Sequence, residues 1–209
     1  MEQNRGRVLR SGRSIVAICS SRPFCERDRT FGYEALMLSR VAVFVALLTA
    51  SWCVMTFVHE SGHVVCGWCG GGQLQEADLA PWGLPYSRFE PDPHPLLTLW
   101  GGPVIGAMLP LVIAAIAKQR WLWFIAYFCL LANGGYLATA WISGERFLDT
   151  PRLLHHGAHP ATIAAFCVVT ISAGYYGFRK ECTHLLSADK RIQPDGSSHA
   201  EPGVGADSR

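Results

Sequence analysis

The feature that most constrains the fold of this chain is an apolar run over residues 41–58, in which Cys53 is the only ionisable side chain. A helix needs about 20 predominantly apolar residues to cross the hydrocarbon core of a bilayer, so this run is a candidate membrane span. Half of the 209 residues are hydrophobic and 16% are charged, which is a low charge content for a soluble domain. The sequence therefore predicts an integral membrane protein.

Three further apolar stretches complete a predicted bundle. The first span extends beyond the run above, so that the predicted spans cover residues 41–65, 96–117, 121–142 and 161–178. Residues 66–95 are rich in glycine and proline, which predicts a loop with room for a strand or hairpin near residues 73–84. We therefore expect an all-α membrane protein, a bundle of about four transmembrane helices with a Gly/Pro-rich loop between the first and second.

Two polar segments flank the predicted membrane domain of residues 41–178. Residues 1–40 hold eight of the 18 basic residues and show no apolar periodicity, which predicts a disordered arm. Residues 179–209 are polar and poor in aromatic residues, which predicts a disordered tail. The net charge is only +2, so the sequence gives no reason to expect a nucleic-acid partner.

Basic residues beside the spans predict a topology, because Lys and Arg concentrate on the cytoplasmic side of a membrane. In a four-span bundle the basic arm, the turn at residues 118–120 and the pair at residues 179–180 all fall on one side. The loop of residues 66–95 contains a single arginine and four acids, and it falls on the other side. We expect a multi-pass protein with both termini in the cytoplasm.

Residues 59–63 read His-Glu-Ser-Gly-His and lie in the last third of the first predicted span. Two imidazoles four positions apart share one face of a helix, so His59 and His63 can bind one metal ion. Zinc accepts imidazole readily, and a catalytic zinc needs three protein ligands plus a water. Glu60 is then placed to take a proton from that water. The alternative is a hydrogen-bonded cluster between helices, but ionisable groups in an apolar helix favour a functional site.

A third ligand should come from the loops or the half of the bundle on the predicted outer side. Asp149 follows the third span on that side. Thr150 suits the N-cap of a helix that begins at Pro151, which leaves Asp149 free to bind a metal. The other candidates are Glu145, His94, His155, His156 and His159.

Several of these features together resemble a known protein family. The motif of residues 59–63, the sequence Trp-Gly-Gly-Pro at residues 100–103, and Asn133 in a later span followed by Asp149 are similar to the site-2 protease-like intramembrane zinc metalloproteases. The resemblance covers about residues 41–155. It identifies the chain as a divergent, minimal branch of that family.

The resemblance implies a set of roles. Zinc (Zn²⁺) would be bound by His59, His63 and Asp149, and Glu60 would act as the general base. Asn133 would correspond to the family's active-site asparagine, which polarises a substrate carbonyl; its alternative role is a hydrogen bond to a neighbouring helix. The implied reaction is hydrolysis of a peptide bond in a membrane protein or peptide that meets the enzyme at the lipid bilayer.

The glycines of the second predicted span have two interpretations. Gly101, Gly102 and Gly106, with Pro103, could break the helix locally and admit the water that hydrolysis in a membrane requires. They could equally provide close packing, because Gly102 and Gly106 have the spacing of small residues at helix–helix contacts.

Two other classes of function compete with a protease. Cys66 and Cys69 form a Cys-x-x-Cys pair just past the first predicted span, which is found in thiol oxidoreductases. A membrane thiol oxidoreductase would leave the motif of residues 59–63 unexplained, and the pair could instead form a small structural disulfide. The remaining alternative is a non-catalytic membrane scaffold or chaperone that binds zinc.

Overall fold

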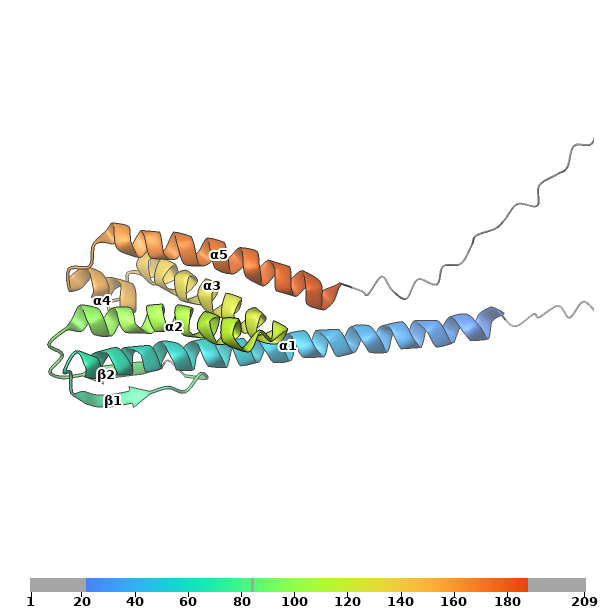
Figure 1. Cartoon of the computed structure of the whole chain (residues 1–209), viewed down its shortest axis with the longest axis horizontal. Coiled ribbons are helices and arrows are strands. Elements are labelled where there is room, and N and C mark those ends of the chain that lie inside the picture. The colour runs from blue at the N-terminus through green and yellow to red at the C-terminus, as the bar shows by residue number, and fades with distance from the viewer. Residues whose placement is uncertain (1–21, 84, 188–209) are drawn as a thin grey trace, which may run out of the picture. The chain divides into compact units, whose positions relative to one another are not determined.

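The computed structural model describes residues 22–83 and 85–187, with side chains described from residue 37 onward. The chain divides into two compact units, Met1–Ser39 and Arg40–Arg209. All of the predicted site residues belong to the second unit. The elements shown in Figure 1 are, in chain order, α1 (Arg22–Cys69), β1 (Leu74–Asp78), β2 (Tyr86–Phe89), α2 (Pro95–Ala117), α3 (Arg120–Ser143), α4 (Asp149–His155) and α5 (Pro160–Leu186).

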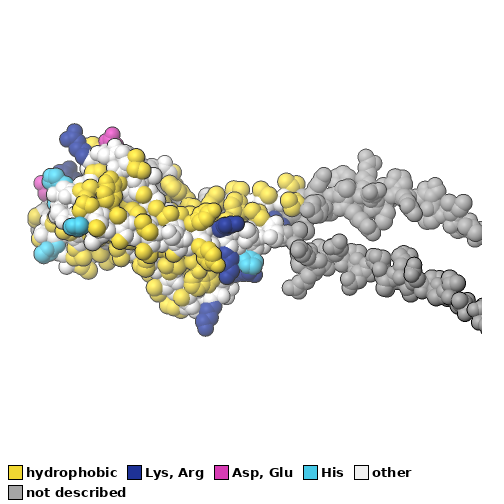
Figure 2. All heavy atoms as spheres, turned by 90° about the horizontal axis from the view of Figure 1, so that it is seen from above, with side chains coloured by type: hydrophobic (Ala, Val, Ile, Leu, Met, Phe, Trp, Pro, Cys, Tyr) yellow, Lys and Arg dark blue, Asp and Glu magenta, His cyan; other side chains and the backbone are white. Residues whose placement is uncertain are grey.

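Four helices in the described part of the chain are long and apolar enough to cross a membrane. These candidate spans are Met37–Cys69, Pro95–Ala117, Arg120–Ser143 and Pro160–Leu186. Large hydrophobic side chains remain exposed along them, including Val112, Ile116 and Val168. Hydrophobic side chains also cover much of the face in Figure 2, as expected where lipid is the solvent. The predicted multi-pass helical architecture is confirmed at this level.

The first helix is longer than predicted. α1 begins at Arg22, so the chain is helical over residues 22–40, where we expected a disordered arm. Pro23 suits the first turn of a helix, where its missing N–H is not needed, and no further proline occurs before Pro81. A helix that has formed in the apolar span extends at low cost, because propagation is easier than nucleation. The rest of the predicted arm, residues 1–21, lies outside the described residues.

The last helix also passes its predicted end. α5 continues to Leu186, so residues 179–186 are helical and not part of a disordered tail. This last part of α5 holds a polar contact between helices, in which Arg120 Nε lies 3.8 Å from Glu181 Oε2. The remainder of the predicted tail, residues 188–209, lies outside the described residues.

The connection between α1 and α2 is more than a loop. β1 and β2 form an antiparallel hairpin in which Leu74 is opposite Phe89 and Asp78 is opposite Tyr86. The first strand lies where a strand was expected, but the second begins two residues beyond the expected region, which ended at residue 84. Trp52 on α1 donates a hydrogen bond from Nε1 to the carbonyl of Pro81, at 2.9 Å, and so ties the tip of the hairpin to α1.

Helix α3 lies at the centre of the bundle and packs against α2, α4 and α5. Small residues permit these contacts, since a Cβ atom added to Gly174 of α5 would lie 2.5 Å from the backbone nitrogen of Leu131. A glycine also permits the close approach of α1 to α2, because a Cβ atom on Gly62 would clash with the carbonyl of Gly101. The main apolar core consists of Leu99, Leu137, Leu153, Ile163 and Cys167.

The short helix α4 starts earlier than predicted. Its first residue is Asp149 and its N-cap is Leu148, without a side-chain cap, so the prediction of Thr150 as N-cap is wrong. The Thr150 hydroxyl instead donates to the carbonyl of Leu137 at 2.7 Å. Thr150 is fully buried, and a buried hydroxyl requires a hydrogen-bond partner, which this carbonyl of α3 provides. The bond holds the start of α4, and with it Asp149, against the bundle.

Candidate metal centre

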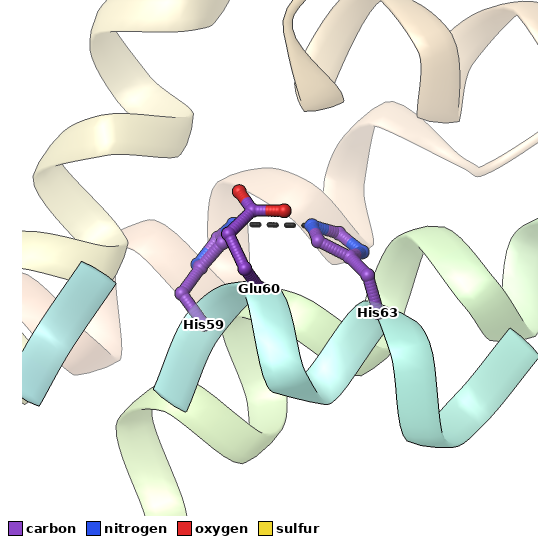
Figure 3. A group of neighbouring side chains, drawn as sticks. All are labelled: His59, Glu60 and His63. Atoms are coloured by element: carbon purple, nitrogen blue, oxygen red, sulfur yellow. Dashed lines mark hydrogen bonds between the residues drawn. The ribbon is translucent and has the colours of Figure 1, made fainter. Parts of the chain in front are cut away.

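The motif of residues 59–63 lies on α1, with its polar side chains turned into the bundle. His59, Glu60 and His63 are all buried, with exposed fractions of 5%, 7% and 5%. Both imidazoles project from the same side of the helix and face each other (Figure 3), with 3.1 Å between their Nε2 atoms. The four-residue spacing therefore brings the two rings to one point, as predicted from the sequence.

Asp149 completes the cluster from the opposite side. Its Oδ2 atom lies 3.0 Å from Nε2 of His59 and 3.2 Å from Nε2 of His63. Burial by itself raises the pKa of Asp149, but the adjacent imidazoles, His63 above all, outweigh burial and hold that pKa well below its usual range. Asp149 is therefore a carboxylate with one oxygen directed at both rings.

The other ring nitrogens show which atoms carry hydrogen. Nδ1 of His63 lies 2.8 Å from the carbonyl oxygen of Thr98, which can only accept, so this nitrogen donates. Nδ1 of His59 lies 2.7 Å from Oδ1 of Asn133. The Nδ2 group of Asn133 donates to the carbonyl of Cys129 at 2.8 Å, which leaves its Oδ1 as the acceptor for His59. When both imidazoles are neutral, each Nε2 atom therefore has no hydrogen and carries a lone pair.

Three acceptor atoms thus meet within 3.2 Å of one another, with no hydrogen to share. Such an arrangement is repulsive unless a cation lies among them, either a metal ion or a proton added to one imidazole. Ligand atoms around a tetrahedral zinc ion, with bonds of about 2.0–2.1 Å, lie about 3.3–3.4 Å apart. Metal-bound histidines also commonly donate their second N–H to a carbonyl group. The residues fit a zinc ion.

Glu60 lies near the cluster but farther from its centre. The ligand atoms of His59, Glu60 and His63 lie within 4.8 Å of one another, so this trio could also hold a metal ion. The oxygen of Asp149 is closer to both imidazoles, at 3.0 and 3.2 Å, which makes it the better third ligand. With Asp149 as the third ligand, Glu60 does not need to bind the metal ion.

The glycines of α2 make room for the cluster. A Cβ atom on Gly102 would overlap the imidazole of His63, and a Cβ on Gly106 would lie 2.7 Å from Oδ1 of Asn133. These contacts favour the close-packing interpretation of both glycines, because each leaves space for a polar side chain of the cluster.

Two cavities meet at the site. A cleft of about 500 Å³ is lined by Glu60, His63, Pro85, Tyr86, Ser87, Arg88, Phe89, Tyr136, Arg146, Phe147, Leu148, Asp149 and Arg152. A smaller and more apolar pocket of about 160 Å³ is lined by Trp52, Met55, Thr56, His59, Glu60, Gly83, Pro85 and Tyr136. Glu60 and Tyr136 line both cavities, and the Tyr136 ring lies edge-on to His59 with 5.3 Å between centroids. A reacting group in either cavity can therefore reach Glu60.

The five residues predicted to form the site, His59, Glu60, His63, Asn133 and Asp149, lie together. The other candidates for a third ligand do not join them, because they are all exposed: Glu145, His94, His155, His156 and His159.

Sequence reasoning missed the Thr98 carbonyl and Tyr136. A backbone carbonyl has no residue signature, so nothing in the sequence marked Thr98. Tyr136 follows Asn133 by three positions, which is one helical turn, and this spacing was an available signal.

Comparison of the chain with models of known protein families, with curated proteins and with solved structures found no match. The function therefore has to be inferred from the chemistry of the site.

Proposed function

We propose that the protein is a membrane-embedded zinc metalloprotease that hydrolyses a peptide bond of a membrane-associated protein. The observation that carries the proposal is the convergence of two imidazole Nε2 atoms and one carboxylate oxygen within 3.2 Å. A buried set of three acceptors beside a cleft would suit a catalytic zinc, which takes three protein ligands and keeps a fourth position open.

His59, His63 and Asp149 would hold the ion. When bound there, zinc would supply a Lewis acid that lowers the pKa of water and polarises a carbonyl group. Thr98 and Asn133 support this role by accepting the Nδ1 hydrogens of His63 and His59, which directs both Nε2 lone pairs at the same point.

Glu60 is the proposed general base. Its carboxylate lines the cleft, so it can accept a proton from a water molecule there and return that proton to the departing amine. Asn133 is fully buried and both of its polar groups are engaged. These contacts favour a positioning role for Asn133, in place of the expected contact with a substrate carbonyl.

The hairpin offers a place for an extended peptide. All four residues of β2 line the cleft, and within the hairpin only one edge of β2 is paired, by β1. A peptide can add to an open strand edge through backbone hydrogen bonds. Such binding would hold the scissile bond in extended form beside Glu60.

We also propose that both termini are cytoplasmic, from the distribution of basic residues. The cleft, which is lined by β2 and by residues between α3 and α5, would then open on the outer side of the membrane. Reporter fusions at residues 80 and 119 test this topology, because the two positions should lie on opposite sides.

A non-catalytic zinc scaffold remains the second candidate, because the same ligand set would serve a structural ion. The thiol oxidoreductase is less favoured. Cys69 is exposed and Cys66 packs against Gly101, and neither is among the residues that line the two cavities at Glu60.

Metal analysis of the purified protein tests the zinc site. We expect one zinc per chain in the wild type and its loss in His63→Ala, whereas His155→Ala, an exposed histidine on α4, should keep the metal. A zinc-free wild type under zinc-replete conditions would refute the site.

Cleavage of a fluorogenic peptide library in nanodiscs then separates protease from scaffold. Glu60→Gln should retain zinc and lose turnover, so persistent turnover in this variant would exclude the proposed base.

A further inference from the structure

The cleft beside Glu60 carries an arrangement of charge that the proposed reaction does not require. Three arginines line it: Arg88, Arg146 and Arg152. Arg88 is compensated, because its Nη2 lies 2.8 Å from Oε2 of Glu90. Neither Arg146 nor Arg152 forms an ion pair with another described residue.

Both of these arginines are exposed at the cleft. Arg152 belongs to α4, the helix that also carries Asp149, and the guanidinium of Arg146 lies 5.7 Å from the centroid of the Phe147 ring. The two are thus held on one short segment, residues 146–152, which borders the cleft opposite α1.

The two acids of the cleft, Glu60 and Asp149, would not neutralise these two arginines once a metal ion is bound. Asp149 is directed at the two imidazoles and Glu60 lies beside them. A divalent ion would offset both of these carboxylates, which leaves Arg146 and Arg152 as uncompensated positive charge. Arginine presents a planar fork that matches a carboxylate, so the complementary ligand group is an acidic side chain.

We propose that the cleft selects peptides with Asp or Glu beside the scissile bond, and that Arg146 and Arg152 are the specificity-determining residues. This inference rests on the proposed function, because it names the substrate class of that site. Exposed pairs of this kind contribute roughly 1.4- to fivefold each in affinity. Two of them predict a preference of about two- to 25-fold for an acidic peptide at low salt, decreasing as salt screens the charges.

Peptide binding, measured without turnover, tests the proposal. The protein carries Glu60→Gln and is placed in phosphatidylcholine nanodiscs, so that lipid adds no net charge. Two fluorescent peptides share one apolar centre and differ only in flanking Glu or Gln, and anisotropy gives the Kd of each. We expect tighter binding of the Glu peptide, loss of this preference in Arg146→Gln/Arg152→Gln, and preference for a Lys-flanked peptide in Arg146→Glu/Arg152→Glu. The matched control is Arg179→Gln/Lys180→Gln on α5, which should behave as the parent.

Equal Kd values for the Glu and Gln peptides, or a preference that survives in the double Gln variant, would overturn the proposal. It would also be overturned if the arginine variants changed only the binding of phosphatidylglycerol vesicles, since the arginines would then contact lipid phosphate. Measuring both Kd values of the Glu60→Gln parent at increasing salt tests the proposal without altering the arginines. A preference for the Glu peptide that does not change with salt is not electrostatic and would also contradict the proposal. Acidic peptides that the protein binds with this preference but that the wild type never cleaves would disprove the protease, and would leave standing only the selection of acidic peptides by Arg146 and Arg152.

Discussion

Asp149 Oδ2 lies 3.0 Å from His59 Nε2, although the two residues are 90 positions apart in the chain. The contact joins the first residue of α4 to the last third of α1. Because His63 Nε2 lies 3.2 Å from the same oxygen, one carboxylate oxygen serves both imidazoles, and the cluster depends on the placement of α4.

Replacement of Asp149 by Asn should remove the negative ligand and keep its shape. We expect the zinc affinity to fall by more than about 100-fold, which exceeds the usual effect of losing a group that only orients a ligand. Isothermal titration with a competing chelator measures this change. Glu145→Gln, an exposed acid of the same loop, is the control and should bind zinc normally. Unchanged affinity in Asp149→Asn would remove this residue from the ligand set.

Gly102→Ala should disturb the site through size alone, because a Cβ at this position overlaps the His63 imidazole. The ring or α2 must shift, so we expect weaker zinc binding, accompanied by a loss of stability of about 1–3 kcal/mol from overpacking. Gly135→Ala is the matched control, since a Cβ there has no neighbour within 4 Å. If both variants bind zinc equally well, the close approach of α2 to His63 has no role in the site.

Asn133→Ala should weaken zinc binding by about 10–100-fold, because His59 loses the acceptor that fixes its Nδ1 hydrogen. Asn133→Asp retains an acceptor oxygen and should recover much of the affinity. Zinc titration of the two variants, together with their turnover, distinguishes positioning from substrate contact. A variant Asn133→Ala with full zinc affinity and no turnover would instead support the carbonyl-polarising role implied by the family resemblance.

Thr150→Val should loosen α4 without touching a ligand. The variant loses the hydrogen bond to the Leu137 carbonyl, which contributes about 0.5–1.5 kcal/mol. We expect a lower melting temperature and a several-fold weaker zinc affinity, since Asp149 is the neighbouring residue. Thr139→Val provides the control, because Thr139 is exposed and its hydroxyl bonds only within α3. Equal melting temperatures of the two variants would contradict the role of Thr150.

The four spans and the residues of the site were accessible from sequence, because both depend on patterns with strong physical meaning. Apolar runs near 20 residues have few alternatives to membrane helices. The spacing of His59 and His63 fixes their common face on any helix. Asp149 could be placed on the correct side of the bundle from the topology alone, and its contact with both imidazoles agrees with that placement.

Other features depend on contacts that sequence does not display. The acceptor for His63 is the main-chain oxygen of Thr98, and every residue has one. The hydroxyl of Thr150 bonds to the carbonyl of Leu137 and does not cap α4, and the proximity of these two residues exists only in the folded chain. α1 extends back to Arg22 because extension of an existing helix is cheap, an effect that local composition does not reveal.

The ligand set has a consequence for the whole fold. His59 and His63 belong to the first helix of the bundle, whereas Asp149 belongs to the segment between the third and fifth, so a bound ion would act as a cross-link between distant parts of the chain. A cross-link that only the native state can form adds its binding free energy to the resistance against unfolding. A chelator should then lower the thermal unfolding temperature of the entire bundle, by an amount that increases with the logarithm of the affinity for the ion.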